Sequence, residues 1–231
     1  DVTRAIGIDT ATAMAEVACV EFDRTNDSEP RVCSTVRRPM KGSHAVHLSA
    51  LLDEALEEAG WNRTDPEGWV AVRGPGSFTG VRIALGAVQG LGFASGHTVR
   101  GVDRLTAMAA KAGRGSLPRV PLMGAGRGEV YGARFDATGM PPVVRTPPSV
   151  ARPAHFLDPN SPARVVVDRI GEIDGLDAKM LPTGYVLEEL SAGIAAAATA
   201  LAFDETFLAT DGAPVAPLYI RPSDAEIKRR G

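Results

Sequence analysis

Residues Val70–Gly96 read VAVRGPGSFTGVRIALGAVQGLGFASG and form the most informative stretch of the chain. The apolar run Val70–Val72 predicts a buried strand. The next eight letters, RGPGSFTG at Arg73–Gly80, form a turn of residues that permit unusual backbone angles or fix φ. A long apolar helix follows over 79–96, with Thr79 as its expected N-cap. We place the rest of the chain around this order of strand, glycine turn and helix.

The helix that follows the turn is unusually rich in small residues. They are Gly80, Ala84, Gly86, Ala87, Gly90, Gly92, Ala94 and Gly96. Each interior glycine lowers helix stability by about 1 kcal/mol relative to alanine. Small residues allow another helix backbone to come close. We therefore expect a close helical neighbour, either the helix predicted over 44–60 or a helix of another chain.

The glycine turn has two interpretations, a phosphate-binding loop and a tight structural turn. It lacks the lysine of a Walker A loop, and Thr79 stands where a GxGxxG pattern needs its third glycine. A glycine-rich turn that leads into a helix still offers N–H groups to an anion. The phosphate candidates in this turn are Gly74, Gly76, Ser77, Thr79 and Gly80.

Asp9 and Thr10 end the first predicted strand and are the other phosphate or nucleotide candidates. An acid followed by a hydroxyl-bearing turn is the arrangement with which actin-like ATPases hold magnesium and phosphate. Those enzymes need a second acid in their second half. The matching stretch here is LMGAGRGE at Leu122–Glu129, where Gly124 stands at the strand end. This difference argues against ATP hydrolysis by the chain alone.

Composition sets broad limits on function. The chain has 231 residues, 44% of them hydrophobic, and a formal net charge of −3. A net negative charge argues against a protein whose main function is to bind nucleic acid phosphates. The basic cluster Arg37, Arg38 and Lys41 is either solvated or a local tRNA contact. No signal peptide or membrane-spanning run is evident, so we expect a cytoplasmic protein with its two cysteines, Cys19 and Cys33, reduced.

The pattern of elements is repeated along the chain. Strands are predicted at 4–9, 15–22, 31–37 and 68–72, helices at 44–60 and 79–96, and a fifth strand at 97–102. A second set follows, with strands at 120–125, 128–136, 143–145 and 164–168, a short helix at 151–157 and an alanine-rich helix at 185–203. This duplication predicts an α/β protein of two halves, 1–103 and 104–231, and we expect the strand-like tail at 217–222 to pack back on the first half.

No constellation of catalytic or metal-binding residues is evident. The four histidines, His44, His47, His97 and His155, are scattered. His44 and His47 lie three apart at the start of the first helix, but no acid or thiol stands at ligand spacing beside them. Ser77 lacks the GxSxG spacing of a nucleophile elbow. We therefore predict no catalytic residue and no metal site.

Short stretches in the same order along almost the whole chain resemble the TsaB family, also called YeaZ. They are IGIDTAT at Ile6–Thr12, His44 with Leu48, RGPGSFTGVR at Arg73–Arg82, Gly101-Val102, RGEVY at Arg127–Tyr131 and PLYIRP at Pro217–Pro222. The stretch at Arg73–Arg82 is fairly specific for this family.

The resemblance implies an actin-like, ribonuclease-H-like (ASKHA) fold of two halves, each with a mixed sheet flanked by helices. It also implies a non-catalytic subunit of the complex that installs threonylcarbamoyl on the tRNA adenosine just 3′ of the anticodon. The partners implied are a TsaD-type transferase, bound through helices of the first half, and a TsaE-type ATPase. No cofactor is expected to bind tightly. Three possibilities stay open: ATP or ADP bound at the partner interface, tRNA bound within the complex, and a homodimer of the free chain.

The expected partner-binding helices are those at 44–60 and 79–96. Their interface candidates are His44, Leu48, Leu51, Leu52, Arg82, Ile83, Gly86, Ala87, Gly90 and Ala94. Three departures from the family pattern bear on these expectations. Gly124 and Gly126 replace an acid and the first of two arginines, Ala11 replaces a serine, and Ala45-Val46 replaces a serine–glutamate pair.

Two other classes of function remain as alternatives. An independent actin-like ATPase or phosphotransferase would depend on Asp9 for magnesium-dependent nucleotide turnover. A metallopeptidase, suggested by an old family name, would need a metal site, and the scattered histidines argue against one.

Overall fold

The computed structural model describes residues 2–25, 29–40, 44–210 and 215–221. The chain forms two compact units, which are Asp1–Ala107 with Ala192–Pro217, and Met108–Ser191 with Leu218–Gly231. This division differs from the expected boundary after residue 103, because the chain returns to the first unit at residue 192 instead of staying in the second.

The first unit is built on a mixed five-stranded sheet. Its strands are β1 (Val2–Asp9), β2 (Met14–Asp23), β3 (Arg31–Pro39), β4 (Gly68–Val72) and β5 (Thr98–Val102). The order across the sheet is β3-β2-β1-β4-β5. β1, β2 and β3 pair antiparallel, whereas β4 runs parallel to both β1 and β5. Every residue of β4 is buried, as expected for a central parallel strand covered on both faces.

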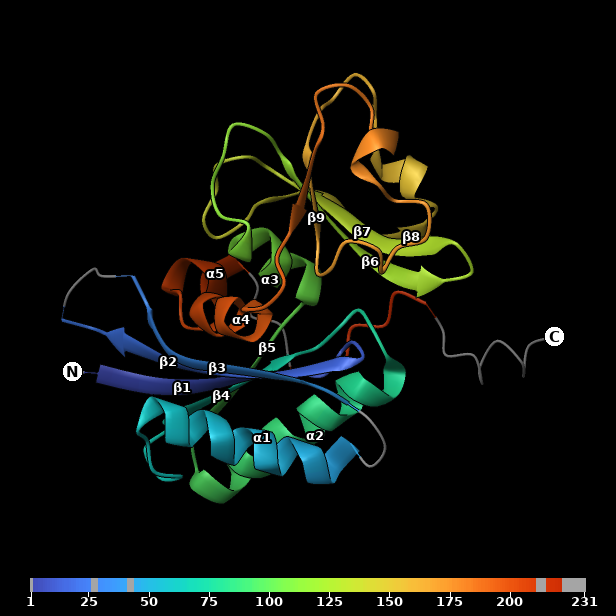
Figure 1. The fold of residues 1–231 in the computed structure, drawn as a ribbon. Helices are drawn as coiled ribbons and strands as arrows, with labels where there is room; N and C mark the ends of the chain where they lie inside the picture. The colour runs from blue at the N-terminus through green and yellow to red at the C-terminus, as the bar shows by residue number, and fades with distance from the viewer. Residues whose placement is uncertain (1, 26–28, 41–43, 211–214, 222–231) are drawn as a thin grey trace. The chain divides into compact units, whose positions relative to one another are not determined.

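Helices cover both faces of this sheet (Figure 1). α1 (His44–Ala59) and α2 (Phe78–Ser95) lie side by side on one face, and α4 (Ile194–Ala202) lies on the other. The helix predicted over 44–60 is confirmed as α1, and its inward leucines and alanines join the core on this face of the sheet. None of the helices within the described residues has both the length and the apolar character needed to cross a bilayer.

The caps of α2 explain why the helix begins and ends where it does. Ser77, not Thr79 as predicted, is the N-cap, and its hydroxyl accepts a hydrogen bond from the Gly80 N–H at 3.2 Å. Gly96 ends the helix in the left-handed region, with φ 71°.

α4 packs unusually close to the sheet. A Cβ at Gly7 of β1 would collide with the Thr199 hydroxyl and with the carbonyl of Ala195. The carboxylate of Glu16, on β2, accepts hydrogen bonds from the N–H groups of Gly193 and Ala195 at 2.9 and 2.7 Å. Gly7 on β1 and the buried Glu16 on β2 therefore hold α4 against the sheet of the first unit.

The second unit repeats the same sheet with shorter connections. Its strands are β6 (Arg119–Gly126), β7 (Glu129–Phe135), β8 (Val144–Ala151), β9 (Arg164–Val167) and β10 (Val186–Glu189), and its 3₁₀ turns are η1 (Pro153–Phe156) and η2 (Ala178–Met180). The order β10-β9-β6-β7-β8 and the pairing directions match those of the first sheet. The predicted duplication of two mixed sheets is confirmed.

Three predictions from local pattern were wrong. The helix expected over 185–203 is a strand, β10, followed by a shorter helix, α4, because Gly193 adopts a left-handed conformation with φ 90° between them. The helix expected at 151–157 is a single 3₁₀ turn. The described part of the tail, 217–221, belongs to no strand. The remaining helices are α3 (Arg104–Lys111) and α5 (Glu205–Thr210).

Candidate functional site

One side of α2 is open to solvent along most of its length. Residues spaced three or four apart share a side of a helix, and this side carries Phe78, Arg82, Gly86, Gly90 and Ala94. Gly86 and Gly90 are exposed, and a Cβ built at either one meets no atom within 4 Å. These glycines therefore leave a smooth, shallow strip of helix backbone at the surface.

Aromatic side chains stand at both ends of this strip. Phe93 is 92% exposed, the most exposed large apolar side chain among the described residues. At the other end, the guanidinium of Arg82 lies 3.8 Å from the ring centroid of Phe78. Phe78 and Phe93 were missed by the sequence analysis, although Phe93 follows Gly90 by three residues and so lies at helical spacing. We call the set Phe78, Arg82, Gly86, Gly90, Phe93 and Ala94 the outer face of α2.

The other two interior glycines of α2 have a different role. A Cβ at Gly80 would collide with the carbonyl oxygen of Thr10, and one at Gly92 would collide with the side chain of Val99. At these two positions the close neighbours are the turn after β1 and strand β5, so the expectation of a helical neighbour is wrong for them. It stays a prediction for Gly86 and Gly90.

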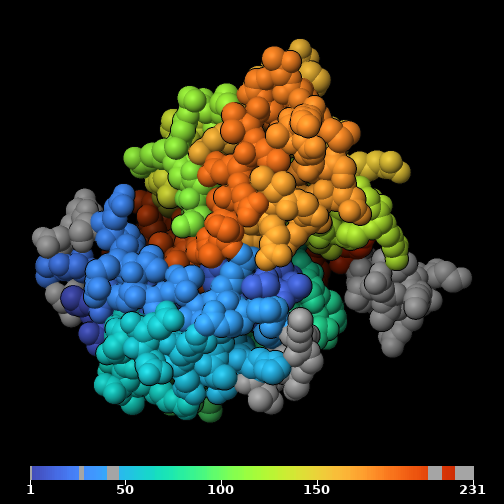
Figure 2. All heavy atoms as spheres, viewed as in Figure 1, coloured from blue at the N-terminus to red at the C-terminus, as the bar shows by residue number. Residues whose placement is uncertain are grey.

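The predicted interface candidates divide by burial. Leu48 and Leu51 are only 5% and 4% exposed and pack in the core. Leu52, Ile83 and Ala87 are half-buried against the same core. The side chain of His44 lies outside the described residues. The space-filling view shows the light-blue and cyan atoms of α1 at the surface of the first unit (Figure 2).

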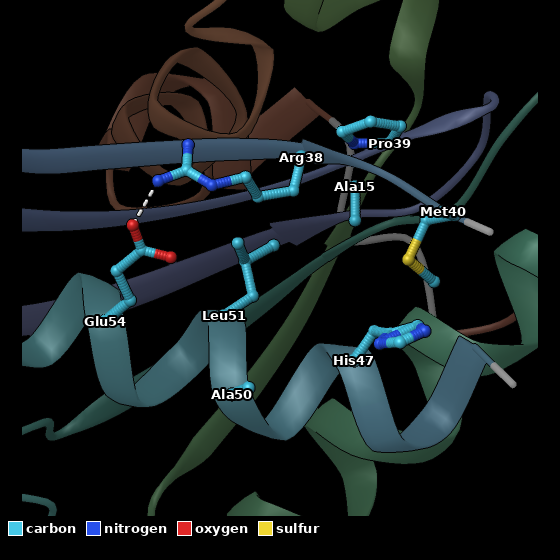
Figure 3. Close-up of a pocket in the computed structure, with 8 residues that line it drawn as sticks. All are labelled: Ala15, Arg38, Pro39, Met40, His47, Ala50, Leu51 and Glu54. Carbon is cyan, nitrogen blue, oxygen red and sulfur yellow. Dashed lines mark hydrogen bonds and ion pairs between the residues drawn. The ribbon is translucent and has the colours of Figure 1, made fainter.

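A groove lies between α1 and the ends of β2 and β3 (Figure 3). It encloses about 290 Å³ and is lined by Ala15, Arg38, Pro39, Met40, His47, Ala50, Leu51 and Glu54. Arg38 and Glu54 form an ion pair across its rim. A second hollow of about 310 Å³ shares Met40 and reaches Thr10, Ser77 and Gly80 at the start of α2. The lining is mainly apolar, with polar groups at the rim.

The structure places the phosphate candidates at the end of β1 next to those of the glycine turn. Their polar groups form hydrogen bonds within the chain. Asp9 is 2% exposed, and its Oδ2 accepts a hydrogen bond from Arg104 Nε at 2.7 Å. Its Oδ1 accepts one from the Ala11 N–H at 2.9 Å. The charge that an actin-like ATPase would offer to magnesium is thus matched here by a buried guanidinium. Arg104 was missed by the sequence analysis.

The glycine turn is packed directly against the residues that follow β1. The Thr10 hydroxyl donates to the carbonyl of Gly80 at 2.7 Å, and the Ser77 N–H donates to the carbonyl of Ala11 at 2.7 Å. Gly74 has φ 99°, a conformation that favours glycine. This geometry supports the structural interpretation of the turn, because its polar groups are directed at the chain itself.

No three His, Cys, Asp or Glu side chains come together at a metal-binding distance anywhere in the described part of the chain. Cys19 is buried and Cys33 half-buried, and neither is in a disulfide. Burial raises the pKa of the Cys19 thiol to about 11, so this thiol is protonated at neutral pH.

The duplicated sheet, with three antiparallel strands followed by two parallel ones, defines an α/β protein of the actin-like, ribonuclease-H-like class. Solved structures agree on the fold. "YeaZ from Pseudomonas aeruginosa" superposes with a TM-score of 0.68 and 24% identity, covering 94% of this chain and 99% of that one. A second structure, described as an uncharacterized Pseudomonas aeruginosa protein similar to peptidase YeaZ, has a TM-score of 0.70, 23% identity and coverage of 95% and 100%.

The family model described as "TsaD: tRNA N6-adenosine threonylcarbamoyltransferase" matches residues 38–225. The chain therefore belongs to this family, and its named relatives group it with the TsaB (YeaZ) proteins. The "tRNA threonylcarbamoyladenosine biosynthesis protein TsaB" of Escherichia coli is 34% identical over 57% of this chain, and the match spans about half, 54%, of that relative. An uncharacterized protein of Mycobacterium tuberculosis is 29% identical over 97% of this chain and 95% of its own length.

Proposed function

We propose that the chain is a non-catalytic subunit in the biosynthesis of threonylcarbamoyladenosine in tRNA, and that it binds and supports a TsaD-type transferase. The names of its relatives support the pathway. The outer face of α2 is the observation that carries the role of a binding subunit. We infer that this face receives a helix of the transferase.

The shape of the outer face favours a helix as its occupant. Gly86 and Gly90 lack side chains, so a partner backbone can approach more closely than the usual 8–10 Å between helix axes. Phe93 stands beside this strip with almost its whole ring exposed. Aromatic side chains are enriched among the residues that dominate binding energy when an interface buries them. The strip therefore allows close contact between α2 and a partner helix, and Phe93 provides an aromatic ring that the interface can bury.

The surroundings of Asp9 support the non-catalytic part of the proposal. Its carboxylate is buried and paired with Arg104, and β6, the strand of the second sheet that corresponds to β1, carries Gly124 near its end. An independent ATPase would need acids at these strand ends that are free to hold magnesium. Because the structure favours this second class of function at neither position, nucleotide turnover by the isolated chain is expected to be absent.

The proposal is tested by titrating the chain with the TsaD-type transferase of the same organism, using calorimetry. We expect saturable 1:1 binding of the wild-type chain. Gly86→Leu and Gly90→Leu are expected to remain folded, because both positions face open space, but to weaken binding by about a hundredfold or more by blocking close approach. Lys111→Leu, which adds the same side chain to an exposed helical position elsewhere, is the matched control.

Two outcomes would contradict the proposal. In the first, the wild-type chain does not bind the transferase, and deletion of its gene leaves the tRNA modification intact. In the second, Gly86→Leu and Gly90→Leu bind as tightly as Lys111→Leu, which would show that the outer face of α2 is not the docking surface. Circular dichroism of each variant separates lost binding from lost structure.

A further inference from the structure

A buried ion pair connects three segments of the first unit that lie far apart in the sequence. Asp9 ends β1, Gly74 opens the turn before α2, and Arg104 begins α3. The side chains of Asp9 and Arg104 are only 3% and 2% exposed, and Nε lies 2.7 Å from Oδ2. The backbone N–H of Arg104 also donates to the carbonyl of Gly74 at 2.6 Å. Arg104 therefore holds the end of β1 with its side chain and the start of the turn with its backbone.

The far end of the turn is held by the residues next to Asp9. The Ser77 N–H donates to the carbonyl of Ala11, and the Thr10 hydroxyl donates to the carbonyl of Gly80. Ala11 is in turn positioned by Asp9, whose Oδ1 accepts the Ala11 N–H. The contacts thus form a continuous path from Arg104 through Asp9 to the N-cap of α2.

The position of this N-cap decides which side of α2 faces outward. An α-helix turns about 100° per residue, so a shift of the start by one residue would move Gly86 and Gly90 well away from the open side. The same contacts leave no space for a Cβ at Gly80, which keeps the first turn of the helix against Thr10. Arg104 lies outside α2, but its pair with Asp9 belongs to the contacts that hold the start of that helix.

We propose that Arg104 is a positioning residue that acts through Asp9 to present the outer face of α2 to the partner. The identity of that partner rests on the proposed function. The effect of Arg104 on the start of α2 does not, and is measured without any partner.

The test removes both charges together, because a single removal would leave an unpaired buried charge and lower overall stability. The double variant Asp9→Asn/Arg104→Met keeps an acceptor for the Ala11 N–H but loses the ion pair. The matched control is Asp136→Asn/Arg119→Met, which removes the pair between a fully buried arginine and Asp136 in the second unit. Amide hydrogen exchange is measured for Gly80 and Val81, whose N–H groups bind the hydroxyl and carbonyl of Ser77.

We expect the Asp9→Asn/Arg104→Met variant to stay folded, with exchange at Gly80 and Val81 faster by about tenfold or more. Its affinity for the transferase is expected to fall by about tenfold as well. The control pair is expected to leave both quantities unchanged. Arg104→Lys keeps the charge and can still reach Asp9, so we expect it to restore most of the protection. If the double variant does not fold, Asp9→Asn alone is the test, because it keeps the acceptor for the Ala11 N–H and removes the charge that binds Arg104. Exchange at Gly80 and Val81 as slow as in the wild type would then overturn the inference.

Unchanged exchange at Gly80 and Val81 in the double variant would overturn the inference, as would equal acceleration in the control. Faster exchange with unchanged affinity would overturn it too, because the pair would then be structural only. If the wild-type chain binds no transferase, the proposed function fails, and the exchange data alone decide whether Arg104 sets the start of α2. Failure of the inference and failure of the proposed function are therefore distinguishable.

Discussion

The two sheets of the molecule have the same strand order and directions, but their connections differ. In the first unit, the links on either side of β4 are helices of 16 and 18 residues, α1 and α2. In the second unit, the links on either side of β9 are 3₁₀ turns of four and three residues, η1 and η2. The duplication is therefore preserved in the backbone pairing and lost in the helices. The outer face of α2, which we propose as the docking surface, lies on the first unit, where two long helices cover one face of the sheet.

The ends of the corresponding strands differ as well. β1 ends at Asp9, which is buried and paired with Arg104, whereas β6 carries the exposed Gly124 two residues before its end. In the first unit, the charged carboxylate of Asp9 stands at the strand end and is buried. The second unit has no such carboxylate in β6. The following changes use this contrast, from the largest expected effect to the smallest.

Arg104→Met is expected to cause the largest loss of stability, about 3–5 kcal/mol, because it leaves the Asp9 carboxylate buried without its partner. Placing an acid near the end of β6 with Gly124→Asp is expected to cost little, since this position is exposed. Urea denaturation of both variants measures the difference. Equal losses of stability in the two variants would show that the buried charge of Asp9 makes no particular demand on its partner Arg104.

Gly7→Ala is expected to cost about 1–3 kcal/mol, because its Cβ would press against the backbone carbonyl of Ala195 in α4. Gly124→Ala is the control on the second sheet, where the nearest atom to the new Cβ is the Glu172 carbonyl oxygen at 3.4 Å. Thermal unfolding followed by circular dichroism compares the two. A loss below about 0.5 kcal/mol in Gly7→Ala would contradict the close packing of α4 on β1.

Phe93→Ala tests whether the docking surface lies on α2 of the first unit and not on the 3₁₀ turn η2 of the second unit. We expect binding to the transferase to weaken by about 2 kcal/mol, with stability unchanged, because the ring is exposed in the free chain. Met180→Ala removes a comparably exposed apolar side chain, 68% exposed, from η2 of the second unit. Calorimetric titration of both variants is the measurement. A similar loss in both would argue against a docking surface confined to the first unit.

Glu16 is expected to give stability a specific pH dependence. Burial raises the pKa of its carboxyl above the ordinary value of 4.5, with the charge of Asp9 adding to this, while two backbone N–H groups and Arg37 oppose it. An acid with a raised pKa in the folded state favours folding below its unfolded pKa, and this contribution is lost as pH rises through the folded value.

The measurement is the difference in free energy of unfolding between wild type and Glu16→Gln, as a function of pH. We expect the wild type to lose stability relative to Glu16→Gln as pH rises above about 4.5. The difference isolates Glu16 from other carboxyls such as Glu21, where hydrogen bonds from Arg31 and Arg4 outweigh the effect of desolvation and lower the pKa. A difference that is constant with pH would contradict the raised pKa of Glu16.

Much of the fold could be predicted from local pattern. The apolar pattern placed the strands of the first sheet and the helix over 44–60, which is α1. The stretch Arg73–Gly80 correctly indicated a turn that starts a helix. These predictions succeeded because the signal for a strand, a turn or a helix lies within a few neighbouring residues. Patterning failed at 185–203, where the alanine-rich composition concealed the break at Gly193.

The sequence by itself determined the duplicated order of elements and the resemblance of this chain to TsaB proteins. Only the tertiary structure decided which glycines of α2 are packed and which are open, because four glycines look alike in a sequence. It also decided that Asp9 pairs with Arg104, 95 residues away, instead of standing ready for a metal. The physical reason is that burial and charge pairing depend on which distant segments meet, and no local pattern encodes that.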